Sequence, residues 1–245
     1  MDRMIYLAMS AARQMMNGQA QAANNLANAN TTGFKRDFEA YRAMPLFGEG
    51  YPSRVFAMAE RPGIDFATGT IEHTGNDFDI AINGDGFIAV QAPDGSEAYT
   101  RAGDLKLSNV GQLLTANGEP VLGNGGPIAL PQSEAVVIGV DGTISTRPLG
   151  QEANALAQID RIKLVNPELG NLVKGEDGLF RTRDGSQPEA DASVTVAQGM
   201  LERSNVNPVT EMISMIENAR QYELAVKAMD TAQTLDAADA QVLRM

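Results

Sequence analysis

Three carboxylates near the middle of the chain, Asp77, Asp79 and Asp85, have the residue type and spacing for acid–base chemistry. Asp77 and Asp79 would share one face of a strand, where paired carboxyl groups can exchange protons with a substrate. The alternative, that all three are solvated residues of turns and strand edges, is the favoured interpretation. His73 is the only histidine, so a two-histidine zinc site is excluded and a Ser-His-Asp triad is disfavoured.

A glycine-rich stretch, residues 84–89 (GDGFIA), matches the G-x-G-x-x-A pattern of dinucleotide sites. Such a site needs a helix after the glycines, whereas strand-like residues follow here, so the pattern predicts a hairpin turn. An EF-hand calcium loop fails as well, because Ala81 and Ala92 would occupy its first and twelfth ligand positions. The chain has no cysteine. We therefore predict no catalytic, cofactor or metal site and no enzyme.

The turn-forming residues divide the chain into three parts. Of the 24 glycines, 22 lie between Gly48 and Gly199, whereas residues 209–245 contain neither glycine nor proline. The two ends therefore read as helices and the middle as a turn-rich β region. The predicted fold is α+β, with long terminal helices paired as an inner helical domain around a central, mostly antiparallel β domain. The predicted boundaries are 1–33 (helix), 34–75 (extended connector), 76–200 (β domain) and 201–245 (helix).

The N-terminal segment carries an apolar stripe at helical spacing that is typical of a coiled coil. We predict that the helix ends at Gly33, since glycine readily takes the left-handed conformation that ends a helix. Three amides near that end, Asn24, Asn25 and Asn28, are explained if they make polar contacts with other subunits. The alternative is that they reflect simple fraying of the helix. The residues predicted to pack against other subunits in this segment are Ile5, Met9, Ala12, Met16 and Leu26.

The C-terminal segment repeats this pattern. Asn207 can cap a helix whose first position is Pro208, and the helix continues toward the end of the chain. The residues predicted to pack against other subunits here are Met212, Ile216, Ala219, Tyr222, Val226 and Met229.

In the middle, five Asp-Gly pairs favour hairpin turns, as do Asn83-Gly84 and Asn117-Gly118. The predicted strands between them cover 78–82, 86–90, 112–115, 135–140 and 159–165, which suggests an antiparallel meander or a small barrel. The net charge of −12 argues against a nucleic-acid partner. No apolar run reaches the roughly 18 residues of a membrane span, and we see no signal peptide.

Several motifs resemble those of the bacterial flagellar axial proteins, the rod and hook subunits. These are NNLAN (24–28) with TGFKR (32–36), DIAINGDGF (79–87), YTRAG (99–103), GMLERSNVNPV (199–209) and RQYE (220–223). They stand in the family's order and together are highly specific. The opening residues resemble the proximal-rod members most closely. Asn76-Asp77-Phe78-Asp79 and Phe87-Ile88 depart mildly from the family pattern, which weakens only the choice among rod subunits.

The resemblance implies a structural subunit of the proximal rod, the drive shaft between the motor and the distal rod and hook. Its terminal helices would pack against copies of itself and other rod proteins. It would be exported unfolded by the flagellar apparatus, without a cleaved signal peptide, to the basal body in the periplasm. Two alternatives stay open: a distal-rod subunit, and a soluble β-domain enzyme or ligand-binding protein that uses Asp77, Asp79 and Asp85.

Overall fold

The computed structural model describes residues 2–45, 55–148, 150 and 156–242. The chain is α+β, with a helix near each end and antiparallel strands between them, as predicted. Its described residues form two units. Unit 1 comprises Met1–Ala29, Arg36–Asp65 and Val206–Met245, and unit 2 comprises Asn30–Lys35 and Phe66–Asn205. The predicted domain boundaries at 33, 75 and 200 stay a prediction.

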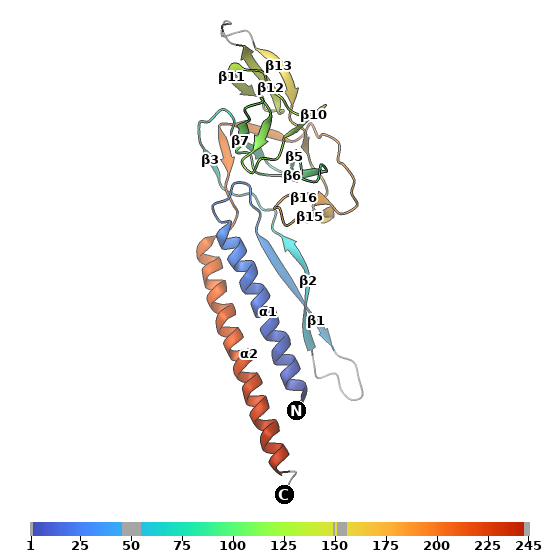
Figure 1. Cartoon of the computed structure of the whole chain (residues 1–245), viewed down its shortest axis with the longest axis vertical. Helices are drawn as coiled ribbons and strands as arrows, with labels where there is room; N and C mark the ends of the chain where they lie inside the picture. The colour runs from blue at the N-terminus through green and yellow to red at the C-terminus, as the bar shows by residue number, and fades with distance from the viewer. Residues whose placement is uncertain (1, 46–54, 149, 151–155, 243–245) are drawn as a thin grey trace. The chain divides into compact units, whose positions relative to one another are not determined.

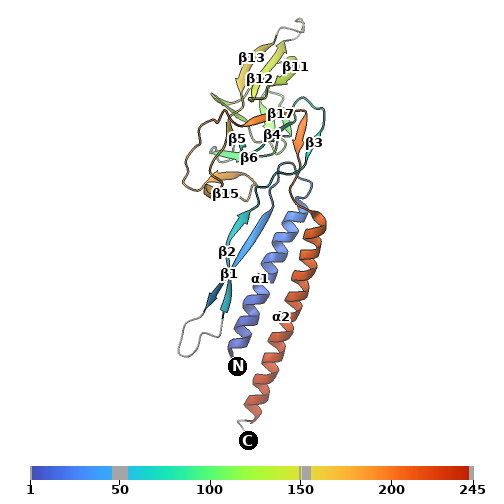
Figure 2. The same cartoon turned by 180° about the vertical axis from the view of Figure 1, so that it is seen from behind.

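Unit 1 contains the two helices, α1 (Asp2–Ala27) and α2 (Pro208–Val242), which run antiparallel and side by side (Figures 1 and 2). Small side chains allow this approach. Ala8, Ala12, Ala22 and Ala232 are buried, and a Cβ on Gly18 would lie 3.1 Å from Nδ2 of Asn218.

The end of α1 corrects the sequence prediction. The helix stops at Ala27 rather than at Gly33, although Gly33 does have positive φ (67°). After Ala27 the chain tightens into a turn, in which the Ala29 backbone N–H donates to the Leu26 carbonyl (3.2 Å), and the Asn28 side chain adds a bond to the Asn24 carbonyl (2.9 Å). The predicted start of α2 is confirmed, because Oδ1 of Asn207 accepts the backbone N–H of Val209 (3.0 Å).

A two-stranded hairpin also belongs to unit 1. β1 (Asp37–Pro45) pairs antiparallel with β2 (Val55–Ile64) and lies beside α1 in both views (Figures 1 and 2). Phe38 stands opposite Gly63, where a Cβ would lie 2.5 Å from the Phe38 ring. These strands occupy part of the segment assigned to an extended connector, of which residues 46–54 lie outside the described residues.

Unit 2 is built of short antiparallel strands. One sheet has the order β14-β5-β6-β16-β15 and another the order β11-β12-β13, while β17-β4, β18-β3, β7-β8 and β10-β9 form pairs. The five predicted strand regions each contain strands. The bounds are β3 Ile71–His73, β4 Ile80–Asn83, β5 Phe87–Gln91, β6 Glu97–Thr100, β7 Leu105–Leu107, β8 Leu113–Thr115, β9 Leu122–Gly123, β10 Gly126–Pro127, β11 Ser133–Ile138, β12 Thr143–Pro148, β13 Ala157–Arg161, β14 Leu164–Val165, β15 Leu172–Lys174, β16 Phe180–Thr182, β17 Thr195–Gln198 and β18 Met200–Glu202.

The core of unit 2 is a single apolar cluster drawn from most of these strands, including Ile80, Ile88, Leu113, Ile144 and Leu164. A separate group of three aromatic rings contains Phe66, Phe87 and Phe180, with centroids 5.4 to 6.0 Å apart. Phe66 thereby anchors the segment that enters unit 2 from β2.

Candidate functional site

The carboxylates with a possible acid–base role do not converge on one site. Asp79 is buried and accepts hydrogen bonds from the Thr74 hydroxyl (2.6 Å) and the Asn76 amide (2.8 Å). Asp77 and Asp85 are exposed. Asp79 therefore orders the loop before β4, and the three predicted carboxylates differ in burial rather than sharing one site.

The glycine-rich stretch and the single histidine also lie in ordinary structural positions. Gly84 and Gly86 have φ of 87° and 131° in the turn between β4 and β5, and a strand rather than a helix follows them. His73 is an exposed residue of β3. Within the described residues, no three His, Cys, Asp or Glu side chains cluster closely enough to hold a metal ion.

The most unusual polar feature is a buried ionic cluster of unit 2, formed by Lys35, Arg101 and Glu202. One carboxylate oxygen of Glu202 lies 2.8 Å from Nζ of Lys35, and the other lies 2.9 Å from Nε of Arg101. The three side chains are exposed by 1%, 4% and 0%. A third donor, the backbone N–H of Gly69, reaches the same oxygen as Lys35 at 2.9 Å.

Backbone carbonyls hold the two cations in place. Nζ of Lys35 donates to the Ala67 carbonyl (2.8 Å), and Nη1 of Arg101 donates to the carbonyls of Gly84 and Gly86 (2.8 Å each). The tight turn between β4 and β5 thus presents carbonyls to a guanidinium, which explains its glycines better than a nucleotide does. The cluster joins chain segments that are distant in sequence, and its role is to hold them together.

A second polar cluster lies in unit 1, where α1, β1 and α2 meet. The Asn25 amide donates to the Asp37 carbonyl (2.9 Å) and accepts from the Asp37 backbone N–H (3.0 Å). The same amide nitrogen lies 3.5 Å from Glu211, which also accepts from Nε of Arg36 (2.6 Å). Asn25 and Glu211 are buried. Asn25 pairs with the β1 backbone in both directions, as a neighbouring strand would.

The predicted subunit-packing residues are divided between the inside and the outside of the helix pair. Ala12 and Asn25 are buried within the unit, whereas Ile5, Leu26, Asn28, Ala219 and Met229 are half-buried. The other members are exposed: Met9, Met16, Asn24, Met212, Ile216, Tyr222 and Val226.

This helix pair reverses the usual arrangement, because small residues lie between the helices while large apolar ones face outward. Met9, Met16 and Ile216 expose 54%, 57% and 56% of their surface. Single exposed apolar residues are ordinary, but a series along one helix marks an interaction surface. α2 has no single apolar face, which fits contacts on more than one side.

Sequence reasoning missed the charged residues of both clusters and one group of exposed apolar residues on α2. Lys35, Arg101 and Glu202 all stand in the quoted motifs, so a charged residue inside each motif was the available signal. Nothing local indicated that they meet. The apolar residues missed were Ile213, Leu224 and Leu235, which lie off the predicted stripe.

Comparison with known proteins decides the family. The family model "Flagella basal body rod protein" matches residues 5–35, "Flagellar hook protein FlgE/F/G D1 domain" matches 81–146, and "Flagellar basal body rod FlgEFG protein C-terminal" matches 197–242. The "Flagellar basal-body rod protein FlgF" of Salmonella typhimurium is 41% identical over 251 residues, which cover all of both chains. The chain belongs to the flagellar basal-body rod protein family.

Other relatives in this family agree. FlgF of Escherichia coli is 42% identical and covers 94% of each chain. FlgG of Buchnera aphidicola from Schizaphis graminum is 33% identical, over 86% of this chain and 88% of its own length. Each matched family region contributes one member of the ionic cluster: Lys35, Arg101 and Glu202, respectively. The cluster therefore ties together the three regions that define this rod protein family.

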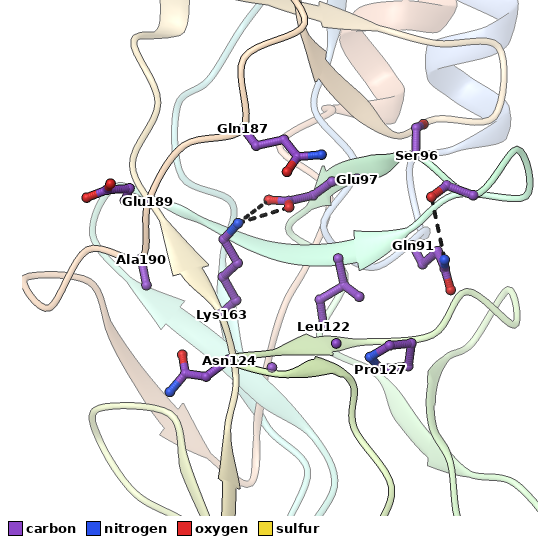
Figure 3. A pocket seen from close by; sticks show the side chains of 13 residues that line it. Gln91, Ser96, Glu97, Leu122, Asn124, Pro127, Lys163, Gln187, Glu189 and Ala190 are labelled. Atoms are coloured by element: carbon purple, nitrogen blue, oxygen red, sulfur yellow. Dashed lines mark hydrogen bonds and ion pairs between the residues drawn. The ribbon is translucent and has the colours of Figure 1, made fainter.

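Unit 2 of this rod-family chain also has an open cleft of about 520 Å³, lined mainly by polar residues (Figure 3). Lys163 and Glu97 point toward each other there and form an ion pair of 2.7 Å. Their charges already neutralise each other, so the cleft presents no unpaired charge of this pair to a ligand. Among the described helices, none has the length and apolar content to cross a membrane.

Proposed function

We propose that this chain is a structural subunit of the proximal flagellar rod and polymerises through its terminal helices. The supporting observation is the outward orientation of large apolar side chains on α1 and α2. Covering the exposed half of one such side chain contributes about 1 kcal/mol, so a neighbour that covers six or more provides several. Free subunits would leave this surface in water.

In this proposal the paired helices form an inner tube domain, and the β region forms an outer domain. The exposed members of the predicted set, such as Met9, Met16, Met212, Ile216 and Val226, are its subunit-packing residues. Asn24 and Asn28 remain candidates for polar contacts between subunits. Asn25 is assigned instead to the junction with β1, because its amide is already used within the chain.

The partners proposed are copies of this chain and other rod proteins, with the export apparatus as a transient partner. The location is the periplasmic part of the basal body, reached in unfolded form. Identity of 41–42% to proteins named FlgF, against 33% to one named FlgG, supports a proximal rather than a distal position. The role is structural, and the subunit transmits torque through stiff packing without catalytic turnover.

The test is Ile216→Asp, which puts a charge on an exposed position and leaves the α1–α2 contact intact. We expect basal bodies that lack this subunit and everything built beyond it, and cells that do not swim, while circular dichroism of the purified chain is unchanged. Gln221→Asp is the matched control on an exposed polar position of α2. Normal rods in the Ile216→Asp strain would refute the proposal.

A further inference from the structure

Most exposed apolar residues of α2 fall in two stripes, while Val209 in the first turn lies on the outside between them. At about 100° per residue, Met212, Ile216 and Val226 lie on one side of the helix, and Ile213, Leu224 and Leu235 on another. The face toward α1 runs between them, and the charged residues Arg220 and Lys227 separate them on the outside. The second stripe is absent from the predicted packing set, although Ile213 and Leu224 are exposed by 52% and 66%.

The second stripe also carries a charge. Glu217 lies on the same side of α2 as Ile213 and Leu224, and it is exposed. The outward face of α1 has the complementary composition: Tyr6, Met9 and Met16 are exposed around Arg13, which is exposed as well. Within the described residues, neither Arg13 nor Glu217 takes part in an ion pair.

The two faces fit each other in register as well as in charge. Suppose that two helices lie antiparallel with Arg13 of α1 beside Glu217 of α2. Seven residues back along α1 and seven forward along α2, Tyr6 then lies beside Leu224. In the other direction, three residues along α1 and four along α2, Met16 lies close to Ile213. These steps of three, four or seven residues keep side chains on one face of a helix. The register differs from the one inside the chain, where Gly18 is opposite Asn218 and Asn25 is near Glu211. The same chain cannot satisfy both registers at once.

We propose that the Ile213–Glu217–Leu224 stripe of α2 binds the Tyr6–Arg13–Met16 face of α1 from a second copy of this chain. The inference rests on the proposed function and names the partner of a surface that the sequence pattern did not reveal. Two different faces meet, so the contact is head-to-tail and continues from copy to copy instead of closing into a dimer. The Arg13–Glu217 pair selects the register, and the apolar pairs on either side of it supply affinity.

The absence of cysteine allows a direct test by disulfide cross-linking. Basal bodies are isolated from cells that express two single-cysteine chains together, Met16→Cys and Ile213→Cys, and are oxidised mildly. We expect a cross-linked heterodimer. Met16→Cys with Met212→Cys, which is next to Ile213 along the helix but on the other stripe, is the matched control and gives several-fold less. A chain carrying both Met16→Cys and Ile213→Cys gives a ladder of higher oligomers, because the contact does not close.

Charge reversal provides a second, independent measurement. Arg13→Glu or Glu217→Arg alone lowers the yield of the Met16–Ile213 cross-link between copies by roughly three- to ten-fold, and the double variant restores it. Arg220→Glu, on the charged outside of α2, leaves it unchanged. Equal cross-linking in the control pair, or no rescue by the double variant, overturns this contact. Both measurements are made on rods that have assembled. Their failure would therefore count against this contact alone, and the Ile216→Asp variant would still test the proposed function separately.

Discussion

Glu202 is the residue whose loss should most weaken unit 2. The substitution Glu202→Gln removes the one negative charge between Lys35 and Arg101 and keeps the size of the side chain. Both cations remain buried, with 1% and 4% of their side chains exposed, and the neutral amide leaves no carboxylate of the cluster to balance their charges. Breaking a buried ion pair by removing one partner leaves an uncompensated charge, which is far more costly than losing a surface pair.

The structure allows the size of the effect to be worked out. Removing one member of a buried pair costs about 3–5 kcal/mol, out of the roughly 5–15 kcal/mol by which a folded domain is stable. With an m-value of about 2 kcal/mol per M, the urea midpoint of unit 2 should fall by about 2 M. Glu72→Gln is a matched control, because Glu72 also pairs with an arginine (Arg203, 2.8 Å) but the pair is half exposed. It should cost less than about 1 kcal/mol.

The assay is urea unfolding followed by far-ultraviolet circular dichroism, with hydrogen exchange to assign the transition to unit 2. A triple variant, Lys35→Met with Arg101→Met and Glu202→Leu, should recover most of the lost stability, because an apolar replacement removes the buried charges along with their pairing. If Glu202→Gln shifts the midpoint no more than Glu72→Gln does, the cluster does not hold unit 2 together.

Three further predictions concern single positions. Asn25→Asp removes the donor to the Asp37 carbonyl and adds a charge near Glu211, so amide hydrogen exchange in β1 should become faster. Asn24→Asp, the control, should leave the exchange rate unchanged. Equal exchange rates in the two variants would refute the role of Asn25 at the junction with β1. Gly33→Ala should cost several kcal/mol more than Gly75→Ala in urea unfolding. Both have positive φ, but only a Cβ at Gly33 would meet backbone, 2.3 Å from the Ala102 nitrogen. Burial raises the pKa of Asp104 above its unfolded value of about 3.9, so the folded state binds its proton more tightly. The stability of the native chain relative to Asp104→Asn should therefore fall as pH rises through the folded pKa, and a pH-independent difference in urea midpoints would contradict this.

Local rules predicted the elements well. Asn207 caps α2 as expected, and Asp94-Gly95, Asp141-Gly142 and Asp177-Gly178 are turns with positive φ at glycine. Each of these outcomes depends on hydrogen bonds or dihedral angles within a few residues, which the sequence states directly.

Contacts between distant residues could not be predicted in the same way. Glu202 bonds to a lysine 167 residues away and to an arginine 101 residues away, and no spacing rule connects such positions. The early end of α1 was missed because the chain turns tightly after Ala27, with the Ala29 backbone N–H on the Leu26 carbonyl, before it reaches Gly33. The β1–β2 hairpin was missed because prolines and Gly63 in residues 34–75 favoured an extended connector, whereas Gly63 makes room for the Phe38 ring across the strand pair.

Both polar clusters make contacts inside the chain, while the large apolar side chains of the helices are exposed, where the proposed packing between subunits would cover them. Burying Asn25 and Glu211 at one end of the helix pair fixes a single geometry for α1, α2 and β1, because an amide or carboxylate without its partner costs more than an apolar mismatch. The alanine-rich contact between the helices adds little transfer free energy of its own. Under the proposed function, polar contacts would specify the geometry of this helix pair, and neighbouring subunits would supply most of its apolar burial. That combination suits a subunit that must present the same faces to every copy in a growing filament.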